Sequence, residues 1–123
     1  EIEWEYCARG GEEHIYSGSN NPDEVGCYGG VYGKGSSHPV GTKRANGFGL
    51  YDMSGNICEW CWDLYDDKAY QEDTTGPTKK SGRVTRSGCW RDRAQGLRCS
   101  FRYGLPPSHR KDYQGFRFVR NGG

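Results

Sequence analysis

The chain contains too few aliphatic side chains to build a large conventional core. Leu, Ile, Val and Phe together supply 16 of its 123 residues, a fraction typical of disordered chains. Disorder also requires high net charge and few aromatic rings, whereas this chain has a formal net charge of +1 and 14% aromatic residues. We therefore expect one compact, loop-rich domain with an aromatic core, in which many of the 20 glycines occupy turns.

Charge and hydropathy argue against two classes of partner. A net charge of +1 lacks the basic excess that binding to nucleic acid or to an anionic membrane requires. No apolar run approaches the roughly 18 residues of a membrane span, so we expect no transmembrane segment. Because the core is small, we expect a further source of stability: a metal ion, a disulfide or an additional piece of chain.

The hydrophobic pattern predicts a helix at the start and strands in the second half. Residues 1–8 predict a helix that ends at Gly10-Gly11, with Trp4, Cys7 and Ala8 on one face. The helix has no N-cap signal, so we expect a further N-terminal portion of the domain. Residues 12–48 predict a long irregular surface segment. Strands are predicted over residues 57–62, 82–90, 97–103 and 115–120, the first with Cys58, Trp60 and Trp62 on one aromatic face.

Six cysteines leave the redox state of the chain open. An even number fits three disulfides, and it equally fits reduced thiols that pack as small apolar groups. Cys58 and Cys61 form the one close pair. Because no second such pair and no paired histidines follow at zinc-site spacing, we interpret them as structural cysteines rather than as a redox or zinc half-site.

Asp52 and Glu59 bracket a tight turn at residues 54–56. A hard cation such as calcium prefers several oxygen ligands, carboxylate and backbone carbonyl, on a flexible loop. The segment is therefore a candidate calcium site. The alternative is that Asp52 caps the turn while Glu59 pairs with a nearby arginine.

Five blocks, in order along the chain, resemble the formylglycine-generating enzyme (sulfatase-modifying factor) family. They are residues Glu3–Gly11, Asn46–Trp60, Arg83–Trp90, Leu97–Arg102 and Gly115–Arg117, and the run Gly-Leu-Tyr-Asp-Met-Ser-Gly-Asn within the second is the most specific. The resemblance implies an α+β, C-type lectin-like fold of the formylglycine-generating enzyme type, loop-rich with short antiparallel strands. It implies a single domain over residues 1–123 that lacks its N-terminal portion.

The resemblance also implies cofactors. Calcium would be held by the side chains of Asp52 and Glu59 and by the carbonyls of Gly55 and Ile57. The enzymes of the family oxidise a substrate cysteine with oxygen and copper(I). They carry two cysteines shortly after a Gly-Gly-Ser motif, and soft thiolates of this kind select copper(I). Here the corresponding motif, residues 87–90, is followed by no cysteine through Gly96. We therefore expect calcium but neither copper nor oxidase activity.

The segments 91–96 and 103–114 form the predicted contact surface. Their mixture of Tyr, Ser, Gly and Arg suits a binding surface, although ordinary variable loops are similarly polar. The predicted ligand-binding residues are Trp90, Arg91, Asp92, Arg93, Gly96, Tyr103, Gly104, Leu105, Ser108, His109, Lys111, Asp112 and Tyr113. Cys89 and Cys99 flank this region, and we expect either a disulfide between them or two buried thiols.

The sequence thus predicts a non-catalytic ligand-binding module for a protein or other surface ligand. One alternative is a variable protein diversified by a retroelement, because such proteins share the fold and vary positions between the Gly-Gly-Ser-Trp and Gly-Phe-Arg frames. Segment 91–113 is rich in residue types whose codons arise from an Asn codon when its adenines are replaced by other bases. The other alternative is a formylglycine-generating or related oxidase. Oligomeric state and compartment stay open, with the cell surface or extracellular space favoured.

Overall fold

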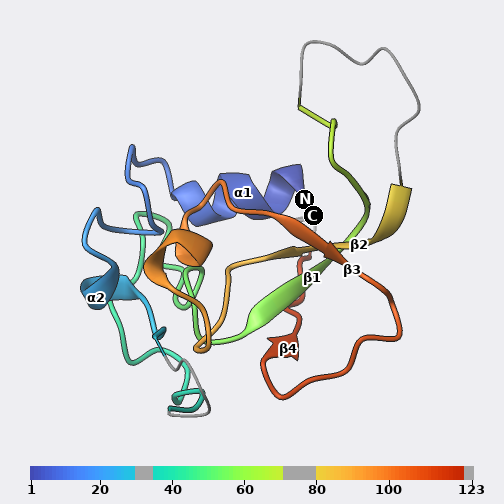
Figure 1. Cartoon of the computed structure of the whole chain (residues 1–123). Coiled ribbons are helices and arrows are strands. Elements are labelled where there is room, and N and C mark those ends of the chain that lie inside the picture. Colours follow the sequence, from blue (N-terminus) through green and yellow to red (C-terminus); the bar gives the residue numbers. More distant parts are fainter. Residues whose placement is uncertain (30–34, 71–79, 121–123) are drawn as a thin grey trace.

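The computed structural model describes residues 1–29, 35–70 and 80–120, and the structural statements below concern these residues. Short helices and strands are joined by long irregular segments (Figure 1). The helical elements are α1 (Ile2–Arg9), α2 (Pro22–Val25) and the 3-10 turn η2 (Ala94–Leu97). The strands are β1 (Cys58–Asp66), β2 (Lys80–Arg86), β3 (Tyr103–Leu105) and β4 (Gln114–Gly115).

The four strands form one sheet in the order β3-β2-β1-β4. β2 is antiparallel to both of its neighbours, and β4 runs parallel to β1. The register places Glu59 of β1 opposite Arg86, and Thr85 opposite Tyr103 of β3. In Figure 1, α2 and the irregular segments around it gather at one end of this sheet. The predicted α+β class is confirmed, with one parallel pair among the antiparallel strands.

Helix α1 forms as predicted. It ends where Gly10 adopts a left-handed conformation with φ 60°, which costs little for a residue without a Cβ. The amide of Asn46 donates to the carbonyls of Cys7 and Ala8 at 2.7 and 3.2 Å, so two carbonyls of the last turn that lack helical partners are satisfied. Trp4 and Ala8 are buried against Met53 and Cys99.

The prediction of an aromatic core is wrong. Among the described residues, Trp4 and Trp90 are the only buried aromatic side chains, whereas Trp62 is 87% exposed. Sulfur and small aliphatic groups fill the interior: the buried set includes Val25, Cys27, Met53, Cys58, Val84, Cys89, Leu97 and Cys99. Backbone segments also approach one another closely. A methyl group at Gly88, for example, would lie 2.4 Å from the Gly96 carbonyl oxygen.

The last three predicted strands are shorter than expected. The strand predicted over 82–90 ends at Arg86, because Ser87 and Gly88 turn the chain with φ angles of 80° and 66°. Residues 97–102 form the end of η2 and a turn instead of a strand, although buried Leu97 and Cys99 alternate with exposed residues as in a strand. The strand predicted over 115–120 reaches only Gly115. The first predicted strand, by contrast, extends to Asp66.

Arg86 at the end of β2 is a fully buried cation that holds α1 to the sheet. Its guanidinium pairs with the carboxylates of Glu1 and Glu5 at 2.8 and 2.7 Å. It also donates to the Cys99 carbonyl and lies 5.1 Å from the centre of the Trp4 ring. Burial opposes ionisation of both glutamates, but hydrogen bonds from their arginine partners outweigh it and lower their pKa values. A buried charge of this kind is tolerated only with such partners.

We expect Arg86→Ala to reduce the free energy of unfolding by about 3–5 kcal/mol, because it removes a buried partner of two carboxylates. Arg86→Lys should reduce the free energy of unfolding by a smaller amount, since lysine retains the charge but not the forked geometry of the guanidinium. Arg44→Ala is the matched control: Arg44 also pairs with a glutamate, but on the surface at 3.4 Å, where an ion pair contributes about 0–1 kcal/mol. Urea unfolding followed by tryptophan fluorescence measures all three.

The same ion pairs predict a pH dependence. Carboxylates with lowered pKa values in the folded state stabilise it above their unfolded pKa, near 4.5, and this contribution is lost as the pH falls through the lowered values. The wild type should therefore lose more stability than Arg86→Ala on acidification. Equal losses in the two proteins would contradict the assigned role of Arg86.

Candidate functional site

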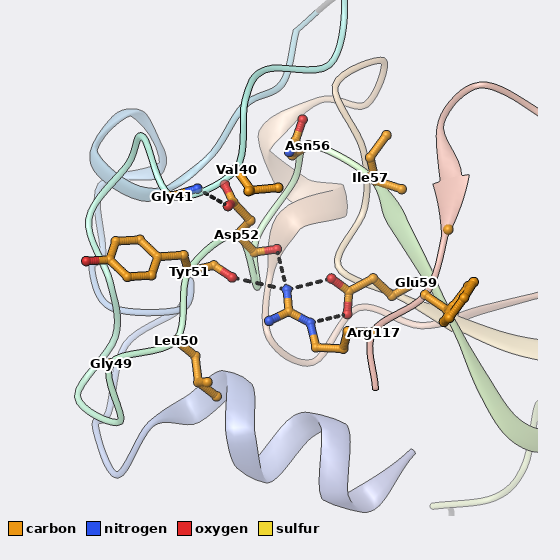
Figure 2. Close-up of a pocket in the computed structure, with 12 residues that line it drawn as sticks. Val40, Gly41, Gly49, Leu50, Tyr51, Asp52, Asn56, Ile57, Glu59 and Arg117 are labelled. Carbon is orange, nitrogen blue, oxygen red and sulfur yellow. Dashed lines mark hydrogen bonds and ion pairs between the residues drawn. The ribbon is translucent and has the colours of Figure 1, made fainter. Parts of the chain in front are cut away.

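The segment predicted to bind calcium lines a surface pocket of about 510 Å³ (Figure 2). Asp52, Asn56, Ile57 and Glu59 contribute to its wall from the turn before β1 and from β1 itself, and Arg117 enters from the segment after β4. The structure therefore brings the two predicted carboxylates to one pocket, and it adds an arginine from a distant part of the chain.

Arg117 makes a two-pronged ion pair with Glu59 in this pocket. The Arg117 Nη2 and Nε atoms lie 2.6 and 2.8 Å from the two carboxylate oxygens (Figure 2). Trp4 donates its ring N–H to the same carboxylate at 2.7 Å. Burial opposes the charged form of Arg117, but hydrogen bonding to Glu59 outweighs it and raises the pKa of the guanidinium. Glu59 is thus buried with two donors that satisfy both of its oxygens.

Two of the other predicted calcium ligands, Asp52 and Gly55, also have protein partners. The Asp52 carboxylate accepts from the backbone N–H of Gly41 at 2.8 Å, and the Gly55 carbonyl accepts from the Ser87 hydroxyl at 3.1 Å. The Arg117 Nη2 atom lies 3.3 Å from the Asp52 carbonyl oxygen. Because a guanidinium already binds Glu59, this arrangement does not fit a calcium ion. Calcium binding stays a prediction from the resemblance. The observed pairing of Glu59 with Arg117 corresponds to the alternative, in which Glu59 pairs with an arginine instead of a metal ion.

A second surface pocket, of about 480 Å³, lies at the predicted contact surface. It is lined by Cys89, Arg91, Asp92, Phe101, Tyr103, Leu105 and Tyr113. Five of these seven are among the predicted ligand-binding residues, and they come from both predicted segments, 91–96 and 103–114. Sequence reasoning did not single out Phe101 for this surface, because it lies between the two segments.

Local structure fixes the floor of this second pocket. The Asp92 carboxylate accepts from the backbone N–H of Cys89 at 2.9 Å, and the Asp92 N–H donates to the Cys89 carbonyl at 3.0 Å, so the two residues close a tight turn. At the rim, the guanidinium of Arg91 lies 5.5 and 5.4 Å from the ring centres of Trp90 and Tyr113. Such cation–π contacts orient an exposed arginine.

The remaining predicted ligand residues lie outside this pocket lining. Trp90 is buried and its exposed edge lines a different pocket, beside Cys27 and His38. Gly96 packs beneath Asp92, and Gly104 packs against Tyr65. His109 contacts Tyr113 with a 3.3 Å hydrogen bond. Arg93, Ser108, Lys111 and Asp112 are exposed.

The flanking cysteines have different neighbours. Cys89 and Cys99 are both buried free thiols. Cys99 packs in the core with Trp4, Ala8 and Met53, whereas the sulfur of Cys89 lies near that of Cys58. Hydrogen bonding to Cys58 lowers the pKa of Cys89. The Cys58 sulfur also lies 2.8 Å from the Tyr103 hydroxyl.

Cys58 and Cys61, the close pair in the sequence, face opposite sides of β1. Cys61 packs against the core cluster around Trp4, and Cys58 lies on the side of Cys89 and Tyr103. The two cysteines therefore form no common site, although the alternation predicted along this strand is interrupted by a register shift after Trp60.

Comparison with known proteins identifies the family. The sequence profile of the Sulfatase-modifying factor enzyme 1-like domain matches residues 1–122. The chain belongs to this family. Relatives with curated names include the chaperone protein LppX of Paenibacillus barcinonensis, which is 39% identical over an alignment of 102 positions that covers 68% of this chain and 36% of LppX. The inactive C-alpha-formylglycine-generating enzyme 2 of Mus musculus is 31% identical over all of this chain and 42% of its own length.

Solved structures confirm the C-type lectin-like fold of the formylglycine-generating enzyme type. Variable protein 1 of Treponema denticola superposes with a TM-score of 0.80 and 36% identity, covering 93% of this chain and 43% of its own. PvdO from Pseudomonas aeruginosa has a TM-score of 0.70 and 28% identity, covering 93% and 48% respectively. The chain thus spans less than half the length of these relatives. None of the helices in the described part of the chain has the length and apolar character of a transmembrane span.

A calcium titration distinguishes the metal-bound arrangement from the arginine-paired arrangement of Glu59. With Arg117 bound to Glu59, we expect added calcium to leave the melting temperature unchanged. Arg117→Ala should lower the melting temperature, because it leaves the buried Glu59 carboxylate short of a charged partner. A calcium-dependent rise in the wild type that a chelator reverses would contradict the arginine-paired arrangement.

Proposed function

We propose that this domain is a non-catalytic ligand-binding module that binds a protein or other surface ligand. The contact surface consists of segments 91–96 and 103–114, with the pocket lined by Arg91, Tyr103 and Tyr113 at its centre. The observation that carries the proposal is the convergence of side chains from both segments on that one pocket. Neither segment could form the pocket alone.

The chemistry of the pocket suits recognition rather than oxidation. Arg91 is exposed at the rim and is oriented by two rings, while half-buried Tyr103 and Tyr113 offer rigid aromatic area. Such anchors bind with little loss of side-chain entropy. No cysteine pair follows Trp90 at the spacing that the resembled oxidases use. The similarity to an enzyme named inactive fits a domain without oxidase chemistry.

The second candidate is a diversified variable protein, which is the same kind of binder with a changeable surface. The observation in its favour is the similarity to variable protein 1 of Treponema denticola, with a TM-score of 0.80 against 0.69 and 0.70 for two other solved relatives. The exposed Arg91, Arg93 and Lys111 could change without disturbing buried packing.

The binding proposal predicts that a multimerised form of the domain recognises particular members of a panel of extracellular proteins and glycans. Arg91→Ala and Tyr113→Ala should each weaken that binding about tenfold or more, as expected for central anchor residues. Arg44→Ala should bind like the wild type, because Arg44 is exposed outside this surface. Binding that survives both pocket substitutions would place the contact elsewhere, and no binding across the panel would count against the module.

Codon variation in the source population tests the second candidate. If the domain is diversified, sequencing of codons 86–117 should show substitutions confined to adenine positions of the template between Trp90 and Gly115. Buried Cys89 and Leu97 should stay constant, because changes there would disrupt packing. A single fixed sequence would exclude diversification and leave the binding module with one native ligand.

A further inference from the structure

Two buried cysteines and one aspartate converge at the floor of the binding pocket. One ligand atom from each of Cys58, Cys89 and Asp92 lies within 4.8 Å of the other two. Cys58 and Cys89 are 0% and 2% exposed, and Cys89 and Asp92 line the pocket. The three residues come from β1 and from the turn after β2, so the fold brings together a donor set that is dispersed in the sequence.

The spacing of these atoms suits a tetrahedral metal ion. Zinc–sulfur bonds of about 2.3 Å place two thiolate sulfurs about 3.8 Å apart in tetrahedral geometry, which is compatible with the upper limit of 4.8 Å on the distances among the three ligand atoms here. The carboxylate of Asp92 is already oriented by the backbone N–H of Cys89 at 2.9 Å.

The donor types select the metal. Two thiolates disfavour hard cations such as calcium and magnesium, which prefer oxygen, and a carboxylate disfavours copper(I). Zinc accepts sulfur and oxygen donors together, and three protein ligands with one open position is a common zinc arrangement.

We propose that Cys58, Cys89 and Asp92 form a zinc site with an open fourth position toward the pocket. On binding, each thiol loses its proton to solvent and becomes a thiolate, so two S–H bonds break and two Zn–S bonds form. Asp92 contributes a carboxylate oxygen, and water or a donor atom of a bound ligand completes the coordination. No redox change is involved.

The surroundings of the cluster support a bound ion. The Tyr103 hydroxyl lies 2.8 Å from the Cys58 sulfur, where it donates to the thiolate and fixes its orientation, as partners of metal ligands do. Three anionic ligands leave one net negative charge around a doubly charged ion, and the cationic Arg91 lines the same pocket. The site is distinct from the Asp52–Glu59 pocket and does not depend on the identity of the domain's ligand.

Metal titration of the folded, reduced chain tests the proposal. The probes are zinc ions, in competition with a chromophoric chelator, and cobalt(II) ions, whose thiolate complexes give charge-transfer absorption. We expect one zinc ion per chain and a cobalt–thiolate band. Cys89→Ala should weaken zinc binding by at least about 100-fold. Removing a residue that only supports a metal ligand costs up to about 100-fold in affinity, and removing a ligand should cost at least as much.

Two further variants distinguish a loss of zinc binding from a loss of folding. Asp92→Asn retains an acceptor for the Cys89 N–H but loses the charge, and it should weaken zinc binding about tenfold or more while circular dichroism stays unchanged. Cys61→Ala is the control, because Cys61 is half-buried beside Trp4 and outside the cluster; its zinc affinity should match the wild type.

The proposal is overturned if the reduced, folded chain gives no cobalt–thiolate band. It is also overturned if Cys89→Ala and Asp92→Asn bind zinc like Cys61→Ala, or if Cys58 and Cys89 form a disulfide and bind no metal after reduction. Binding of ligands in the panel experiment is measured separately. Loss of the metal site would therefore leave the binding module intact, and failure of the panel would leave the metal site intact.

Discussion

The architecture depends on one buried cation. Arg86 ends the central strand β2, and its guanidinium reaches Glu1 and Glu5 of the N-terminal segment as well as the Cys99 carbonyl beyond η2. A chain with few aliphatic side chains has little apolar area to bury, so it cannot hold α1 to the sheet by hydrophobic contact alone. A forked cation with several directional donors replaces part of that contact, and it fixes both the helix and the turn that leads to the pocket.

Strand β1 divides the molecule into two chemically different sides. Its neighbouring residues Cys58 and Glu59 point in opposite directions, as strand geometry requires. On one side, Glu59 joins Trp4 and Arg117 in a network of charge-assisted hydrogen bonds in which both carboxylate oxygens accept. On the other side, Cys58 lies near Cys89, Tyr103 and the carboxylate of Asp92. The proposed zinc site lies on this second side, whereas calcium binding at the Asp52–Glu59 pocket stays a prediction from the resemblance.

Features set by neighbouring residues could be predicted from the sequence, and features set by distant contacts could not. The helix before Gly10 and the strand after Ile57 are local, and both were predictable. The approach of Cys58 to Cys89 depends on the pairing of β1 with β2, so no spacing in the sequence indicates it. The prediction of a strand at 97–103 was wrong. Leu97 and Cys99 are buried at alternate positions, as in a strand, but here a turn after η2 gives the same alternation. The resemblance indicated the contact segments but not that their side chains would form one pocket.

The structure separates what must stay constant from what can change at the contact surface. Gly88 and Gly96 approach so closely that an added methyl group at Gly88 would lie 2.4 Å from a carbonyl oxygen, and Cys58 and Cys89 are buried. Arg91 and the residues around it are exposed and can be replaced at small cost to stability. A metal ion held by the frame would therefore offer every surface variant the same coordination position, while the exposed side chains determine which ligand can reach it.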